Sequence, residues 1–268
     1  IKIKNKNLSK NFKLNILKEE AEQDRIYIKS KIGNASINSK EIKKNDIFFA
    51  IKGKNKDGNQ FVNQAFNKGA SLAIVNKFDK SKSSLRQIKV LNSLKLLTRA
   101  SSIVRENSIG KIIAITGSCG KTSLKELLAK TLSKFSHVTY SPKSFNNKYG
   151  VPLSLFNLNP KHDFGVFEVG MDKKGEIDRL TKIIQPDVGV ITNISYAHVK
   201  NFKNIKEIAM AKAEIIKNIN KDGCIVLNRD DQFYKLHHKI ALNKNLKIFS
   251  FSMKKNNADV KMNYIKKV

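Results

Sequence analysis

The segment with the clearest chemical signature is an apolar run, residues 112–116, that continues into Gly117-Ser118-Cys119-Gly120-Lys121-Thr122-Ser123. A strand, a glycine turn and a helix in this order let backbone N–H groups and the helix dipole face phosphate oxygens. In such a loop Lys121 would reach the β- and γ-phosphates, and the Thr122 hydroxyl would ligate Mg²⁺. The sequence therefore predicts an ATP-binding loop whose contacts come from residues 117–123.

This loop departs from the common pattern G-x-x-x-x-G-K-[ST], because Ile115 stands at the first glycine position. What remains is the shorter form T-G-S-x-G-K-T, and an ordinary strand-to-helix turn that uses Gly and Lys is the alternative. Cys119 is either a nucleophile or a loop residue whose backbone matters. The second interpretation is favoured, because no His–Asp pattern surrounds this cysteine.

Two other apolar runs end in residues that could serve the same phosphates. Glu168 lies at the end of the run 165–169, and Asn193 and His198 come at or after the end of the run 188–194. The carboxyl ends of parallel strands meet at one edge of a sheet, so these side chains are expected to converge on the loop. A carboxylate and an imidazole near phosphates suit divalent cations, although His198 could equally be an ordinary loop histidine.

Lys212 differs from the other lysines by its position. It lies four residues after Ile208 and three before Ile215, within the apolar stripe of a helix predicted over residues 205–219. One interpretation is a lysine whose ammonium group reaches solvent along the helix surface. The other is a lysine whose pKa is lowered by burial, so that its neutral amine can react with CO₂ to give a carbamate.

The elements that must position these residues form two α/β domains, and the predicted boundary follows residue 85. In the first domain, strands at 46–51 and 72–75 flank a helix at 61–68, an order that favours parallel pairing. The second domain, residues 86–268, alternates strands with helices, which predicts a mostly parallel sheet covered on both faces. Its expected strands are 112–116, 165–169, 188–194 and 224–228, and its expected helices are 94–104, 121–135, 174–184 and 205–219.

Composition excludes several classes of protein. No apolar stretch is long enough to span a membrane, and the N-terminus has no signal-peptide pattern. The two cysteines, Cys119 and Cys224, lie far apart and fit a reducing cytoplasm. The net charge of +30 suggests nucleic acid, but only six of the 52 basic residues are arginines. Drift toward AT-rich codons explains the abundant Lys, Asn and Ile, so nucleic acid is not expected as the main partner.

Several blocks of this sequence resemble the Mur ligases, the ATP-dependent amide-forming enzymes of peptidoglycan synthesis, and in particular their MurF group. The resemblance begins at the T-G-S-x-G-K-T loop and continues in the same order and spacing along nearly the whole chain. The first domain matches at Phe48-Phe49-Ala50-Ile51-Lys52-Gly53 and Asp57-Gly58. The second domain matches at Phe145-Asn146-Asn147, Gly150-Val151-Pro152-Leu153, Phe167-Glu168-Val169-Gly170, Thr192-Asn193-Ile194, Ala197-His198, Ala211-Lys212-Ala213-Glu214-Ile215 and Leu227-Asn228-Arg229-Asp230-Asp231.

The resemblance implies a role for each matching position. It implies a UDP-substrate domain with Ser39 as a contact, although Asn38 and Lys40 replace the usual acid and arginine there. It places Asn146 and Asn147 at the substrate cleft. The alternative is that these two residues cap a turn before Gly150. The remaining implied roles are nucleotide binding by Asn193 and Asn228, one Mg²⁺ on Thr122 and Glu168, a second on His198 and carbamylated Lys212, and catalysis by Lys121, His198 and Lys212.

The function implied is an ADP-forming ligase that joins D-alanyl-D-alanine to UDP-N-acetylmuramoyl-tripeptide through an acyl phosphate. The cofactors would be ATP and Mg²⁺, and the protein would be a cytoplasmic monomer. The chain stops at Val268, so the C-terminal ligase domain of this family is expected to be absent from it. A MurE-type or folylpolyglutamate-type ligase, a phosphate-loop ATPase that powers motion, and a basic nucleic-acid-binding module are the alternatives.

Overall fold

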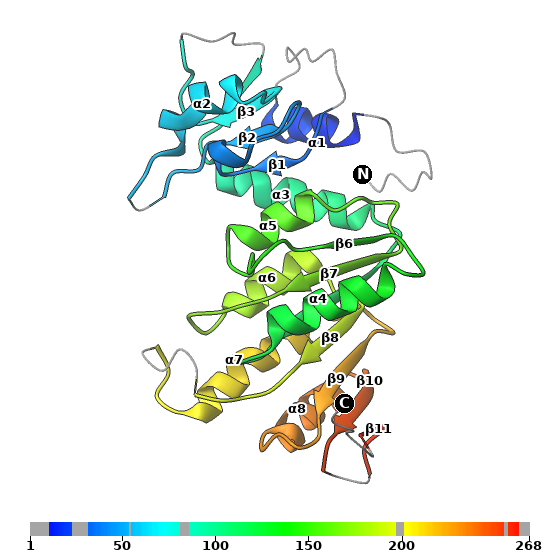
Figure 1. The fold of residues 1–268 in the computed structure, drawn as a ribbon. Helices are drawn as coiled ribbons and strands as arrows, with labels where there is room; N and C mark the ends of the chain where they lie inside the picture. Colours follow the sequence, from blue (N-terminus) through cyan, green and yellow to red (C-terminus); the bar gives the residue numbers. More distant parts are fainter. Residues whose placement is uncertain are drawn as a thin grey trace, which may run out of the picture. The chain divides into compact units, whose positions relative to one another are not determined.

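The computed structural model describes residues 11–22, 32–53, 55–80, 86–196, 201–254 and 257–262, and the chain divides into two compact units (Figure 1). The first comprises residues 1–107 with Leu155–Asn157, and the second comprises 108–154 with 158–268. The division therefore follows Asn107 instead of residue 85, because helix α3 (Ser93–Glu106) packs against helix α1 (Phe12–Ala21). Among the described residues, no helix is long and apolar enough to cross a membrane.

The first unit contains a four-stranded, entirely parallel sheet. Its order is β1 (Ala35–Ser36), β2 (Ile47–Phe49), β3 (Leu72–Val75) and β4 (Gln87–Lys89). A 3₁₀ turn (Gly58–Phe61) and helix α2 (Val62–Asn67) connect β2 to β3, which confirms the predicted strand–helix–strand unit. A short 3₁₀ turn, Ser39–Glu41, precedes β2.

The second unit contains a seven-stranded sheet in which every pairing is parallel, as predicted. The chain passes from β5 outward to β6, returns to β7 beside β5, and then continues on the other side of β5 with β8. A reversal of strand order of this kind places the ligand site of an open α/β sheet at the carboxyl end of the central strand. The spatial order is β11 (Val260–Lys261), β10 (Lys247–Ser252), β9 (Cys224–Asn228), β8 (Val188–Ile191), β5 (Lys111–Thr116), β7 (Phe164–Glu168) and β6 (Val138–Tyr140).

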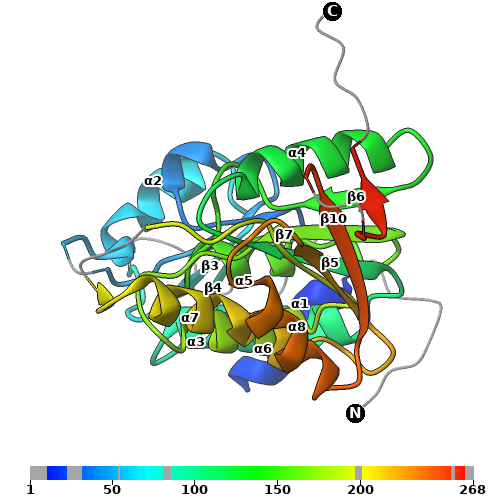
Figure 2. The same cartoon turned by 90° about the horizontal axis from the view of Figure 1, so that it is seen from below.

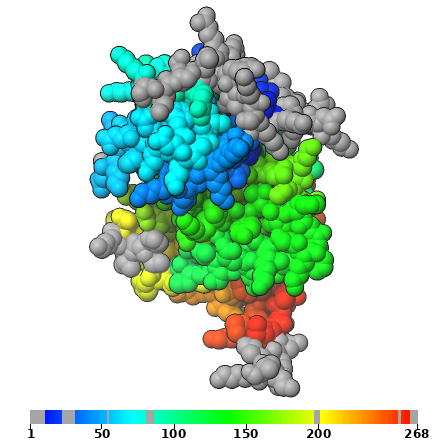
Figure 3. All heavy atoms as spheres, turned by 45° about the horizontal axis from the view of Figure 1, so that its top comes forward, coloured from blue at the N-terminus to red at the C-terminus, as the bar shows by residue number. Residues whose placement is uncertain are grey.

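Helices cover both faces of this sheet, as Figure 2 shows for the second unit. Helix α4 (Lys121–Leu132) lies on one face, where its leucines pack on a core of Ile115, Val166 and Val190. Helices α6 (Glu176–Ile184), α7 (Ile205–Lys217) and α8 (Tyr234–Leu242) lie on the other. Helix α5 (Gly150–Phe156) follows β6. In Figure 3 the green colour range includes helix α4, several of whose residues are exposed at the surface of the second unit.

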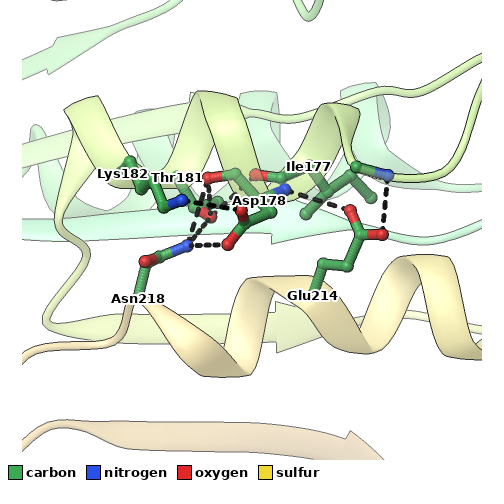
Figure 4. A network of polar contacts seen from close by, with 7 residues as sticks. Ile177, Asp178, Thr181, Lys182, Glu214 and Asn218 are labelled. Atoms are coloured by element: carbon green, nitrogen blue, oxygen red, sulfur yellow. Dashed lines mark hydrogen bonds and ion pairs between the residues drawn. The ribbon is translucent and has the colours of Figure 1, made fainter.

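Polar groups join α7 to α6 at two points along their length (Figure 4). The buried carboxylate of Glu214 accepts hydrogen bonds from the N–H groups of Gly175 (2.7 Å) and Asp178 (3.1 Å), at the start of α6. A carboxylate is favoured there because it faces the positive end of the helix dipole. Further along, the Asn218 amide donates to Asp178 Oδ1 (3.0 Å) and to Thr181 Oγ1 (2.9 Å). These contacts fix which side of α7 faces the sheet.

Removal of the Glu214 carboxylate tests this docking. Glu214→Ala leaves two partly buried N–H donors without their acceptor, and we expect it to lower the free energy of unfolding by about 2–3 kcal/mol. Glu207→Ala on the same helix is the control, because Glu207 is exposed and should cost at most about 1 kcal/mol. Urea unfolding measures both, and equal losses in the two variants would contradict the docking role.

Candidate functional site

The phosphate loop, residues 117–120, follows the central strand β5 and is braced by the segment that follows β8. The Ser118 N–H donates to the carbonyl oxygen of Asn193 (2.9 Å), and the Cys119 N–H donates to its side-chain oxygen (3.1 Å). The Ser118 hydroxyl donates to the carbonyl oxygen of Ser195 (3.1 Å) and accepts from its N–H (2.9 Å). Asn193 therefore acts in this structure as a support of the loop.

Gly117 is the position in the loop that tolerates no side chain. Its φ is +149°, and a Cβ built on it would lie 1.9 Å from the Thr192 hydroxyl oxygen. That hydroxyl also donates to the carbonyl oxygen of Cys119 (2.7 Å). Gly120 has a φ of +81° and begins α4, but a Cβ there would meet nothing within 4 Å. Thr192 is thus a structural partner of the loop, a role that the matching block Thr192-Asn193-Ile194 did not assign to it.

Two lysine ammonium groups meet at one carbonyl oxygen of the loop. Lys121 Nζ donates to Gly117 O (2.9 Å) and to Ser118 O (3.2 Å), and Lys212 Nζ donates to Gly117 O (2.9 Å). The burial predicted for Lys212 is confirmed, since 1% of this residue is exposed. Burial first, and the nearby charge of Lys121 second, lower the pKa of Lys212 to about 7. Carbamylation of Lys212 stays a prediction.

A second group of side chains gathers at the end of β7, next to the first turn of α4. Thr122 Oγ1 donates to Glu168 Oε2 (2.7 Å), and Asn146 Nδ2 donates to Glu168 Oε1 (2.7 Å). Ser144 Oγ lies 3.4 Å from Thr122 Oγ1. The residues expected to hold one Mg²⁺, Thr122 and Glu168, therefore lie in contact with each other.

This oxygen-rich group has the chemistry that Mg²⁺ requires. Mg²⁺ is commonly held by one or two carboxylates together with substrate phosphates, and not by a cage made only of protein groups. Within the described ranges there is no cluster of three or more His, Cys, Asp or Glu side chains suited to a metal. One carboxylate and one hydroxyl beside a phosphate loop match the first kind of site.

The other expected site residues have different surroundings. Asn147 accepts hydrogen bonds from the N–H groups of Tyr149 (3.0 Å) and Gly150 (3.1 Å), so it supports the start of α5, the alternative role named for it. Asn228 Nδ2 donates to the carbonyl oxygen of Thr192 (3.2 Å).

Ser39 was expected as a UDP-substrate contact in the first domain, and Ser123 and His198 were expected at the nucleotide and metal sites of the second. In the first unit, Ser39 is buried and its hydroxyl donates to Gln64 Oε1 (2.5 Å). Ser123 lies exposed in the first turn of α4. His198 lies outside the described residues.

A parallel sheet with a phosphate loop at its central strand defines the phosphate-loop class of α/β domains. Residues 115–268 match the Mur ligase middle domain, and residues 31–105 match the domain described as "Mur ligase family, catalytic domain". The chain belongs to the Mur ligase family.

Similar proteins agree with this assignment. A UDP-N-acetylmuramoyl-tripeptide–D-alanyl-D-alanine ligase of Rickettsia prowazekii is 39% identical over 211 residues, which are 79% of this chain and 46% of that protein. A crystal structure of MurF from Acinetobacter baumannii superposes with a TM-score of 0.81 at 32% identity, over 94% of this chain and 55% of that one. MurF from Thermotoga maritima in complex with ADP gives 0.68 at 30% identity, over 83% and 51%. The chain spans about half the length of the curated relatives it matches.

The two loop glycines offer a matched test of the loop geometry. Gly117→Ala forces a Cβ onto Thr192, and we expect a loss of about 3 kcal/mol or more in the free energy of unfolding. Gly120→Ala meets open space and should cost only the strain of its left-handed backbone, about 1–2 kcal/mol. Urea unfolding without nucleotide measures both variants, and a larger loss for Gly120→Ala would refute the role given to Thr192.

The lowered pKa of Lys212 predicts a pH-dependent stability. In the folded chain the amine is neutral above about pH 7, whereas in the unfolded chain it stays charged up to about pH 10.5. Between these values the unfolded state binds more protons, so the contribution of Lys212 to stability rises with pH. Lys212→Met should therefore be more stable than the wild type at pH 7. The difference between their free energies of unfolding should fall by about 1.4 kcal/mol per pH unit between pH 7 and 9.

Denaturant unfolding in CO₂-depleted buffer measures this difference without interference from a carbamate. Lys206→Met is the control for the loss of one lysine, because Lys206 is exposed on the same helix. A difference between Lys212→Met and the wild type that does not change from pH 7 to 9 would show that Lys212 is charged in the folded chain.

Proposed function

We propose that this chain carries the nucleotide-binding and UDP-substrate-binding parts of an ATP-dependent ligase. The reaction would join D-alanyl-D-alanine to UDP-N-acetylmuramoyl-tripeptide in peptidoglycan synthesis. The observation that carries the proposal is the pairing of Thr122 with Glu168 (2.7 Å) beside a phosphate loop that ends in Lys121. Relatives named for this reaction, at 30–39% identity, support the choice of substrates.

The first step would form an acyl phosphate. An oxygen of the tripeptide carboxylate attacks the γ-phosphorus of ATP, the bond to the β–γ bridging oxygen breaks, and ADP leaves with that electron pair. Lys121 would leave the carbonyl oxygens of the loop to meet the phosphates, where its charge stabilises the transferring group. Thr122 and Glu168 would hold Mg²⁺, which when bound offsets charge on the phosphoryl oxygens.

The second step would form the amide. The amino group of D-alanyl-D-alanine attacks the acyl carbon, phosphate leaves, and the nitrogen loses a proton. Asn146 would lie at the substrate cleft and orient the Glu168 carboxylate through its hydrogen bond. Asn147 would contribute to this cleft only indirectly, by supporting the start of α5. His198 and a carbamylated Lys212 are proposed for a second Mg²⁺. Asn193 is proposed to bind ATP, Asn228 to lie near the adenine, and Ser39 to contact the UDP-sugar.

We further propose that the protein acts as a monomer in the cytoplasm, where its nucleotide substrates are found. A nucleic-acid partner is not part of the proposal, because the excess of lysine over arginine does not favour phosphate or base recognition.

Phosphate release from ATP by the full-length protein tests the function. Release is expected only when UDP-N-acetylmuramoyl-tripeptide and D-alanyl-D-alanine are present together. Lys121→Ala and Glu168→Gln should each lower the rate at saturating substrates by about 100-fold or more. Lys130→Ala, an exposed position on the same helix as Lys121, is the control and should retain the wild-type rate. Release that depends on DNA or RNA instead would overturn the ligase assignment.

A further inference from the structure

Lys125 is a buried lysine that neither the loop motif nor the proposed chemistry uses. It stands on α4, three residues after Thr122 and four after Lys121, so it lies on the same side of the helix one turn later. Its side chain has no exposed surface, whereas Lys130 on the same helix is exposed. A buried ammonium group is unfavourable unless it is well partnered, so its partners indicate what it does.

The ammonium group of Lys125 holds a loop of the main chain. It donates a hydrogen bond to the carbonyl oxygen of Lys143, and it lies 3.0 Å from the Glu126 carboxylate. Lys143 has a φ of +49°, a left-handed conformation that is unfavourable for a residue with a side chain. The lysine thus contacts the turn in the β6–α5 connection where the backbone changes direction.

The next residues of this connection reach the proposed magnesium position. Ser144 Oγ lies 3.4 Å from Thr122 Oγ1, and Asn146 Nδ2 donates to the Glu168 carboxylate (2.7 Å). The carbonyl oxygen of Asn146 also accepts from the N–H of Gly170 (2.8 Å). The loop formed by residues 141–147 is therefore joined to two successive turns of α4 and to the end of β7.

The fit at Gly170 shows that this loop has little freedom to shift. A Cβ at Gly170 would lie 2.9 Å from the side-chain carbon Cγ of Asn146, which means that the amide packs directly against the backbone. A small displacement of the loop would break the bond from Asn146 to Glu168. Groups that orient a metal ligand in this way typically change metal affinity 10- to 100-fold when they are lost.

We propose that Lys125 is a positioning residue, whose ammonium group holds the 141–147 loop against α4 so that Ser144 and Asn146 keep Thr122 and Glu168 in the geometry that binds a magnesium nucleotide. This inference rests on the proposed function, since it assumes that Thr122 and Glu168 hold Mg²⁺. Lys125 belongs neither to the phosphate loop nor to the group of side chains around the Glu168 carboxylate.

The test compares ADP binding by the full-length protein in Mg²⁺ and in EDTA, by isothermal titration calorimetry. Lys125→Met keeps the length and apolar stem of the side chain but removes the charge and the donor. We expect it to weaken binding of ADP with Mg²⁺ by about 10-fold or more, and to leave ADP binding in EDTA within about twofold of the wild type. Hydrogen exchange should speed up at the backbone amides of residues 141 and 143–147.

Controls separate this role from a general loss of structure. Lys130→Met removes an exposed lysine of the same helix and should match the wild type in both conditions. If Lys125→Met does not fold, Lys125→Leu takes its place, because it also removes the charge and the donor to the Lys143 carbonyl. An unchanged ratio between the Mg²⁺ and EDTA affinities in a folded variant, or an equal loss in both, would overturn the proposal. Absence of ADP binding by the wild type would instead refute the proposed function.

Discussion

The carbonyl oxygen of Gly117 is the point on which the arrangement of the second unit depends. It accepts hydrogen bonds from the amino groups of two lysines, Lys121 of α4 and Lys212 of α7, and these helices lie on opposite faces of the sheet. Gly117 lies at the end of the central strand β5, where the chain turns into α4. At this point its carbonyl oxygen is within reach of Lys121 on α4 and of Lys212 on α7. The positive φ of Gly117 and the closeness of Thr192 are what that position requires. The contacts of Glu214 with the start of α6 then fix the side of α7 from which Lys212 reaches the loop.

Several strands and the burial of Lys212 could be predicted from the sequence, because at these positions the local apolar pattern agrees with the packing of the folded chain. The strands at β5, β3 and β9 are continuous apolar runs, and the position of Lys212 in an apolar stripe indicated its burial correctly. The predicted strand over residues 188–194 ends at Ile191 in the structure. Of the residues that follow, Thr192 and Asn193 use polar groups to brace the phosphate loop, and the N–H of Ile194 donates to Asp231 Oδ2 (2.7 Å). Such contacts are not visible in the apolar pattern.

Other features could not be predicted because distant parts of the chain decide them. The sequence did not indicate β6, whose side chains are partly buried or exposed, or β10, in which the buried residues are the serines Ser250 and Ser252. Strand β11 is a two-residue strand at the edge of the sheet. Asn146 and Asn147 are adjacent and chemically identical, yet one contacts Glu168 and the other supports α5. Lys125 was overlooked for a similar reason, since in a chain so rich in lysine one more lysine on a helix resembles a solvated residue.

The same structure also explains why the large net charge says little about a partner. At the site, charges are satisfied by neutral groups: Lys121 and Lys212 donate to carbonyl oxygens, and Glu168 accepts from a hydroxyl and an amide. Among the described residues, none of these three makes an ion pair. Neutral partners hold the side chains of Lys121 and Glu168 in place without cancelling their charge, so the cation remains available to phosphate and the carboxylate to a metal ion. Lys212, whose pKa is lowered to about 7, is charged in the folded chain only below about that pH. Charged groups held in this way matter more for binding a nucleotide and its metal ion than the many solvated lysines elsewhere, whose effect salt would screen.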